Sequence, residues 1–307
     1  MPLERDEIIM KTRNAFDSYH PIVNFVYFTL IIVFSMFFMH PVCLVISFCF
    51  AFCYSVKLKG KKALKFNILY MLPMIIAAAL INPAFNHEGA TVITYLKTGN
   101  PLTLESILYG LAAALMLASV ICWFSCYNEV MTTDKFIYLF GKAIPSMSLI
   151  LSMVLRFVPR FREQIKIISN AQKCIGRDIN NGSILSRAKN GLTILSIMIT
   201  WALENAIETA DSMKSRGFGL PGRTAFSIFK LDKRDKIVFA ILLSAGIYII
   251  AGSLFGGVYF RYFPYIKGTE YSFFSVSVFF TYFALCALPV IIEILEDLRW
   301  NAIKSKI

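Results

Sequence analysis

The chain has 307 residues, of which 57% are hydrophobic and 16% are charged. A soluble domain of this composition would have too few polar side chains to cover its surface, so we expect a membrane protein that crosses the bilayer several times. Lysine and arginine outnumber aspartate and glutamate by 31 to 19, which in a membrane protein more often marks cytoplasmic loops than a nucleic-acid interface, so we expect no nucleic-acid partner.

Six stretches contain no Asp, Glu, Lys or Arg and are each about as long as the 17 to 25 residues that a bilayer-spanning helix needs. In chain order they are residues 21–39, 41–56, 66–85, 106–128, 237–260 and 271–292. The second, with about 16 residues, is the shortest of them. These stretches predict an all-α polytopic membrane protein with about six transmembrane helices.

The distribution of lysine orients these spans. The segment "KLKGKKALK" between the second and third spans has five lysines and no acidic residue, so we expect it in the cytoplasm. Alternation along the chain then places both termini inside and predicts a multi-pass protein of the cell membrane. It also divides the chain into a membrane part at 1–128, a cytoplasmic insert at 129–236, and a membrane part with a cytoplasmic tail at 237–307.

Cysteine usage gives no indication of disulfide bonds or of a bound metal. The chain has seven cysteines, an odd number, and its two C-x-x-x-C pairs have no histidine or carboxylate partner nearby. We interpret the pairs as buried small apolar residues and expect neither a metal nor another cofactor. The cysteines are Cys43, Cys49, Cys53, Cys122, Cys126, Cys174 and Cys286.

The insert predicts two long helices. The first contains an apolar run of about thirteen residues that ends at Arg156 and is too short to cross a bilayer. The second, over 192–216, separates into two faces in its second half. An acidic ridge is formed by Glu204, Glu208, Asp211 and Ser215, and a small-residue groove is formed by Ala202, Ala206, Ala210 and Met213. The pattern fits close packing against another helix, and it fits a solvated surface helix equally well.

The second helix should end at "SRGFGLPG", because Gly217 and Gly219 permit positive φ and Pro221 cannot continue a helix. Two explanations account for Arg216 in the last turn, and the residue spacing does not choose between them. The helix dipole favours a cation there, and a guanidinium also offers a fork of donors to a partner protein. In the fifth span, Gly252 and Gly256 have a spacing that favours a close helix contact.

Several common catalytic and transport signatures are missing from the sequence. It has no phosphate-binding loop, no H-E-x-x-H motif and no G-x-S-x-G motif. The spans also lack the Asp, Glu, Lys and Arg residues that ion-coupled carriers place inside the membrane. We therefore expect that the chain does not hydrolyse ATP by itself and is not a zinc enzyme or a serine hydrolase.

Four segments together resemble the transmembrane T component of energy-coupling factor (ECF) transporters, the EcfT/CbiQ-like family of vitamin and metal uptake systems. They are "YHPIVNFVYF" at the first span, "RFVPRF" at 156–161, "AQKCIGRD" at 171–178 and "ADSMKSRGFGLPGRTAF" at 210–226. The resemblance implies a non-catalytic subunit that couples two cytoplasmic ABC ATPases, alike or different, to a membrane S component, with ATP hydrolysis carried out by the ATPases. The S component would bind a vitamin, a related micronutrient or a metal ion for uptake.

The resemblance also implies roles for single residues. In this family, short Ala-Arg-Gly or Ala-Arg-Ser motifs end two coupling helices, and their arginines contact the ATPases. The second motif corresponds to Ser215-Arg216-Gly217. In the first, after Ala171-Gln172, the family arginine aligns with Ile175 and the glycine with Gly176, whereas this chain has its arginine one residue after that glycine, at Arg177. Each residue along a helix rotates the side chain by about 100°, so Arg177 is equivalent only if the helix has ended by Gly176; Arg187 is an alternative.

The groove residues Ala202, Ala206, Ala210 and Met213 would then allow close crossing or contact with the S component. Two other functions remain open. An integral-membrane enzyme would use Glu204, Glu208 and Asp211 to hold a divalent ion. A self-sufficient secondary transporter would work without any ATPase.

Overall fold

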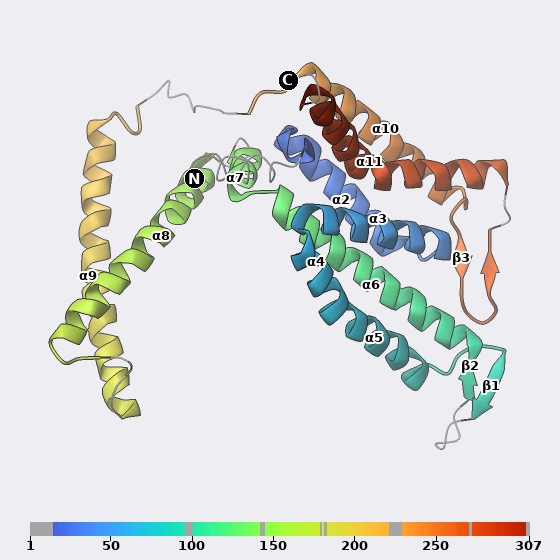
Figure 1. The fold of residues 1–307 in the computed structure, drawn as a ribbon, viewed down its shortest axis with the longest axis horizontal. Coiled ribbons are helices and arrows are strands. Elements are labelled where there is room, and N and C mark those ends of the chain that lie inside the picture. Colours follow the sequence, from blue (N-terminus) through green and yellow to red (C-terminus); the bar gives the residue numbers. More distant parts are fainter. Residues whose placement is uncertain are drawn as a thin grey trace. The chain divides into compact units, whose positions relative to one another are not determined.

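A computed structural model describes residues 15–95, 101–141, 145–178, 180, 183–220, 229–269 and 272–304 (Figure 1). The chain divides into two compact units. Met1–Phe136 and Phe229–Ile307 form one, which we call the membrane unit, and Ile137–Ile228 form the other, which we call the insert unit. Each is described by itself.

The membrane unit is built from helices that follow the six charge-free stretches. They are α2 (Pro21–Phe37), α3 (Pro41–Lys59), α4 (Lys61–Phe66), a π-helical turn η2 (Asn67–Met71), α5 (Leu72–Phe85), α6 (Leu104–Val130), α10 (Lys233–Leu254) and α11 (Phe273–Lys304). A short 3-10 turn, η1 (Ala15–Ser18), precedes α2. The prediction of an all-α polytopic membrane protein is confirmed.

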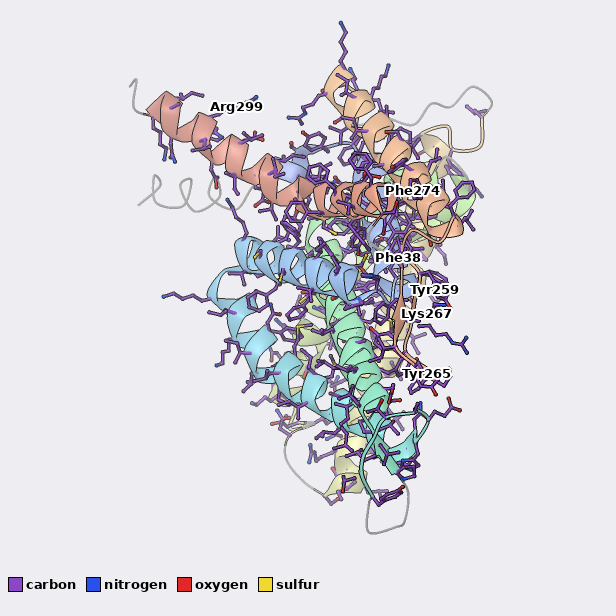
Figure 2. All side chains as sticks on the ribbon, turned by 90° about the vertical axis from the view of Figure 1, so that its right-hand side faces the viewer. Phe38, Tyr259, Tyr265, Lys267, Phe274 and Arg299 are labelled. Carbon is purple, nitrogen blue, oxygen red and sulfur yellow. The ribbon has the colours of Figure 1, made fainter. Side chains whose placement is uncertain are left out.

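Five of these helical segments are long and apolar enough to cross a membrane: Pro41–Lys59, Ala63–Phe85, Leu104–Val130, Lys233–Leu254 and Phe273–Lys304. The first predicted span forms only the 17-residue helix α2. The last one is longer than predicted, because α11 continues past the charge-free stretch, through Arg299, to Lys304 (Figure 2). Charged side chains end an apolar stretch without interrupting the backbone hydrogen bonds of a helix.

The core of the membrane unit is aromatic and contains a few paired polar groups. Helix α6 packs against α2, α3 and α5, and its Trp123 is fully buried between Tyr27 and Tyr54, with ring centroids at 6.2 and 6.4 Å. The indole Nε1 donates to Ser47 Oγ at 3.0 Å, and Ser47 in turn hydrogen-bonds Ser35 at 2.7 Å. Pairing these groups removes most of the cost of burying them.

Two small antiparallel hairpins, which the sequence did not predict, lie between helices of the membrane unit. Strands β1 (Val92–Tyr95) and β2 (Pro101–Thr103) precede α6, and β3 (Phe260–Arg261) and β4 (Lys267–Gly268) join α10 to α11. Figure 2 shows the second hairpin with Tyr259, Tyr265 and Lys267 along it. The Ala90 N–H donates to the Pro264 carbonyl at 3.2 Å, so the two connections are tied to each other.

The predictions about Gly252 and Gly256 and about the paired cysteines are each correct in part. A Cβ on Gly252 would lie 2.5 Å from Val278 Cγ2, so α10 does approach α11 closely at this glycine, whereas Gly256 lies in the turn after α10, with φ +79°. The cysteines are all free. Burial is correct for the pair Cys122 and Cys126 and wrong for Cys49 and Cys53, which lie on an exposed face of α3.

Candidate functional site

The insert unit contains the two predicted long helices. They are α8 (Pro145–Cys174), with 30 residues, and α9 (Ile184–Ser215), with 32 residues; α7 (Thr133–Gly141) begins in the membrane unit and leads toward them. Helix α9 begins at Ile184 rather than at residue 192, because Ser183 caps it by accepting a hydrogen bond from the Ser186 N–H at 3.4 Å.

Helices α8 and α9 cross each other (Figure 1). Their contact is a small cluster in which Trp201 packs edge-on against Phe161 with ring centroids at 5.6 Å, and the Arg160 guanidinium lies 5.7 Å from the Trp201 ring. Beside these rings, Ile168, Ile194 and Met198 are buried. Arg160 of α8 therefore supplies one contact to α9.

Helix α9 ends in a glycine cap. Gly217 has φ +79°, its N–H donates to the Lys214 carbonyl at 3.0 Å, and the Phe218 N–H donates to the Met213 carbonyl at 3.0 Å. This pair of hydrogen bonds is the Schellman motif, which satisfies carbonyls left without partners at a helix end. Arg216 is the last residue before the glycine, and its side chain is exposed.

Helix α8 ends in the same motif. Gly176 has φ +83°, its N–H donates to the Lys173 carbonyl at 3.0 Å, and the Arg177 N–H donates to the Gln172 carbonyl at 2.9 Å. The side chain of Lys173 pairs with Asp178 at 3.8 Å. The two glycines thus hold equivalent positions at the ends of two successive long helices.

Matching the two caps hydrogen bond by hydrogen bond defines the register of the two motifs. Ile175 corresponds to Arg216, and Arg177 corresponds to Phe218. The helix has therefore ended before Arg177, but Arg177 occupies the position after the glycine rather than the position before it. At the position of Arg216, helix α8 presents Ile175, whose side chain is 69% exposed.

The two predicted faces of α9 are both accessible in the insert unit. Glu204, Glu208, Asp211 and Ser215 are exposed, as are Ala206 and Ala210, while Ala202 and Met213 are half-buried. Within the described ranges of the chain, no three His, Cys, Asp or Glu side chains gather closely enough to hold a metal ion. The acidic ridge is therefore a row of separate exposed carboxylates on one helix.

Sequence reasoning missed how much apolar surface the two helices expose. Large side chains with helical spacing lie open to the surroundings on both, since the small buried cluster covers only one side of each helix. On α8 they include Ile150, Val154, Val158, Ile165 and Ile167, and on α9 Leu195, Ile199, Leu203 and Ile207. A soluble monomer rarely exposes a continuous apolar face of this kind, so the helices need a partner or a membrane surface.

Comparison with known proteins places this architecture in a family. The model of the CbiQ family, described as cobalt transport protein, matches residues 17–228, which include α8 and α9. The chain is also similar to proteins named energy-coupling factor transporter transmembrane protein EcfT. The one from Lactobacillus helveticus (strain DPC 4571) is 35% identical over 114 residues, covering 36% of this chain and 41% of that protein.

Two other relatives align over longer stretches. EcfT of Staphylococcus aureus (strain 04-02981) is 26% identical over 201 residues, covering 62% of this chain and 72% of that protein. EcfT 1 of Listeria monocytogenes serotype 1/2a (strain 08-5578) is 28% identical over 211 residues, covering 64% and 75%. The chain spans about two fifths of the length of the first curated relatives that it matches. These matches confirm the resemblance found in the sequence, while the roles of single residues stay predictions.

Proposed function

Because the chain belongs to the CbiQ family of cobalt transport proteins, we propose that it is the transmembrane coupling subunit of an ECF-type importer in the cell membrane. The observation that carries this proposal is the pair of long helices α8 and α9, which end in the same glycine cap and expose apolar faces. Such a pair suits a subunit that passes movement between a soluble partner at the helix ends and a membrane partner along the faces.

The ends of α8 and α9 would contact two cytoplasmic ABC ATPases, which would supply the phosphate-binding loops that this chain lacks. A glycine cap holds the preceding residue rigidly at the tip of the helix. At the tip of α9, Arg216 would then present its donors to carboxylate or carbonyl groups in a groove of the ATPase. Ser215 and Gly217 would allow the close approach of the partner backbone.

The tip of α8 would contact the second ATPase through different chemistry. Ile175 lies where α9 has Arg216, and Arg177 follows two positions later with its backbone N–H already used in the cap. We expect Ala171, Gln172 and Gly176 to shape this tip and Arg177 to contact the rim of the groove. The apolar Ile175 would be buried in the complex.

The exposed faces of α8 and α9 would bind a membrane S component. The small side chains of Ala206 and Ala210 let another helix approach closely. Leu203 and Ile207 beside them are exposed and supply apolar surface, and each Å² of that surface contributes about 25 cal/mol when it is buried. Movement of the ATPases would then shift the two helices and reorient the S component. The substrate, a vitamin, a related micronutrient or a metal ion, would be selected by that component.

Reversing the charge of Arg216 tests this assignment. We expect Arg216→Glu to abolish co-purification of the ATPases with the tagged chain from its native membrane, because it opposes the charge that the groove receives, while insertion into the membrane is unchanged. Lys189→Glu is the matched control, since it reverses an exposed charge on the same helix away from the cap.

Unchanged recovery of the ATPases with Arg216→Glu would contradict the role of this residue. Recovery of the wild-type chain without any ATPase, together with ion-driven uptake by the purified chain alone, would contradict the proposed function and favour a secondary transporter. Turnover of a lipid or a nucleotide by the purified chain would instead favour the enzyme alternative.

A further inference from the structure

The chain passes between the membrane unit and the insert unit twice, between Phe136 and Ile137 and again between Ile228 and Phe229. These two connections are covalent routes by which movement of α8 and α9 can reach the membrane unit. If a connection is flexible where it joins the membrane unit, movement of the insert unit is lost there. If it is held in place by side-chain contacts, the movement is transmitted. The residues that fasten each connection on the membrane side are therefore informative.

The first connection is fastened by a buried lysine. Lys135, in the first turn of α7, is 4% exposed. Its ammonium donates to the Val130 carbonyl at 3.1 Å, to the Asp17 carbonyl at 2.6 Å and to the Asp17 carboxylate. An ammonium has three donors, so these acceptors use all of them. Val130 is the last residue of α6, so Lys135 ties α7 both to the end of the central helix and to η1.

The second connection is fastened to the same turn. Arg234, in the first turn of α10, donates to Ser18 Oγ at 3.1 Å, and its guanidinium lies over the ring of Tyr19 at 4.2 Å. Cation–π contacts of this length are attractive. The capping box of Asp232 and Asp235 fixes the start of α10 around this arginine.

The turn itself is set firmly into the core. The ring of Phe16 is fully buried, with centroids 5.0 Å from Tyr27 and 6.2 Å from Phe28, both on α2. The amide of Asn24, also fully buried on α2, lies next to the same group, with its two polar atoms 3.1 Å from the Phe16 carbonyl oxygen and from the Lys135 ammonium nitrogen. Residues 15–19, which we call the N-terminal turn, therefore contact both connections and the bundle at once.

We propose that the N-terminal turn is a positioning element for energy coupling, holding both connections so that movement of the insert unit is transmitted to the membrane unit. This inference rests on the proposed function. It assigns Asp17 and Lys135 to the first connection and Ser18, Tyr19 and Arg234 to the second. A merely structural role in folding would not need both connections to meet on one five-residue turn.

The test compares Lys135→Met and Arg234→Gln with a matched control in the complex that co-purifies from the native membrane. Removing Lys135 leaves Asp17 partly exposed and able to hydrate, since its side chain is 31% exposed, so folding should survive. Arg234→Gln removes an exposed contact and leaves no buried charge. Lys57→Met is the control, because it breaks the exposed Lys57–Asp297 pair, which links α3 to α11 and includes no residue of the N-terminal turn or of either connection.

The first measurement is hydrogen exchange in the full chain. Amides at 136–139, which are the first in α7 with intrahelical acceptors, should exchange about tenfold faster in Lys135→Met, and those at 236–239 faster in Arg234→Gln, with neither changed in Lys57→Met. The second measurement uses spin labels on Cys53 and Cys174, both exposed, after Cys49→Ser removes the third exposed cysteine. Adding ATP and vanadate should change the label-to-label distances in the wild-type complex.

In Lys135→Met, and more so with Arg234→Gln added, the ATP-dependent distance change should be lost while ATP hydrolysis by the co-purified ATPases continues. A distance change equal to that of the wild type would overturn the proposal, as would equal exchange at 136–139. The two levels of inference fail differently. If the wild-type complex contains no ATPase, the proposed function fails, and if it responds to ATP but the variants respond equally, only the role of the N-terminal turn fails.

Discussion

Replacing Gly252 by alanine should destabilise the membrane unit, because the added methyl group has no space. Its carbon would lie 2.5 Å from Val278 Cγ2 and 3.2 Å from Cγ1. Valine in a helix has essentially one side-chain rotamer, so it cannot turn away. Overpacking of this kind costs about 1–3 kcal/mol, and the gain from replacing a helical glycine offsets about 1 kcal/mol. We expect a net loss of up to about 2 kcal/mol.

Gly246→Ala is the matched control on the same helix. A Cβ there would meet Leu30 Cδ1 at 3.1 Å, which is the flexible end of a side chain that can shift. This variant should be neutral or slightly stabilising. Thermal unfolding in lipid nanodiscs, followed by tryptophan fluorescence, measures both variants, with about 2–4 °C expected for each kcal/mol.

A second-site change makes this prediction sharper. Val278→Ala removes the two methyl groups that the new Cβ would meet, so Gly252→Ala with Val278→Ala should be more stable than the sum of the two single changes implies. Equal stability of Gly252→Ala and Gly246→Ala, or simple additivity in the double variant, would refute the close approach of α10 and α11 at Gly252.

Two further predictions concern helix caps. Valine at Gly176 or Gly217 should fray the last turn of α8 or α9, because φ values of +83° and +79° cost a β-branched residue about 1–2 kcal/mol. Hydrogen exchange of the amides at 170–174 or 211–215 measures the fraying, and protection equal to that of the wild type would contradict the cap. At the start of α3, burial lowers the pKa of His40 below 6.5, and the neutral Nδ1 accepts the Val42 N–H at 3.3 Å. The folded protein therefore disfavours protonation, so stability should fall as the pH drops below 6.5 and level off below the lowered pKa. His40→Asn retains a cap acceptor without titrating and should flatten this dependence; an unchanged pH profile would exclude His40 as its source.

The tips of α8 and α9 separate what local sequence can predict from what it cannot. Gly217 followed by Gly219 and Pro221 predicts a helix end, because positive φ and a missing N–H are properties of single residues. The register of Arg177 was harder to predict, since the glycine spacing fits more than one position of the arginine. The hydrogen bonds of the cap resolve it by pairing Ile175 with Arg216.

The membrane class, the approximate spans and the two long helices could be predicted from the sequence alone. These depend on unbroken apolar runs and on helical periodicity, and both are read within about twenty neighbouring residues. Family resemblance added the coupling role and the importance of the helix tips. Neither source indicated that α8 and α9 would expose so much apolar surface.

Only the tertiary structure brought Asp17 to Lys135, which is 118 residues away, and Ser18 to Arg234, which is 216 residues away. In the sequence these are isolated polar or charged residues near span ends. Their meeting depends on the packing of the helices in the membrane unit, where Phe16 packs against α2 and η1 packs against α11. A contact between residues that are distant in the sequence depends on the packing of whole helices, so no local sequence pattern predicts it.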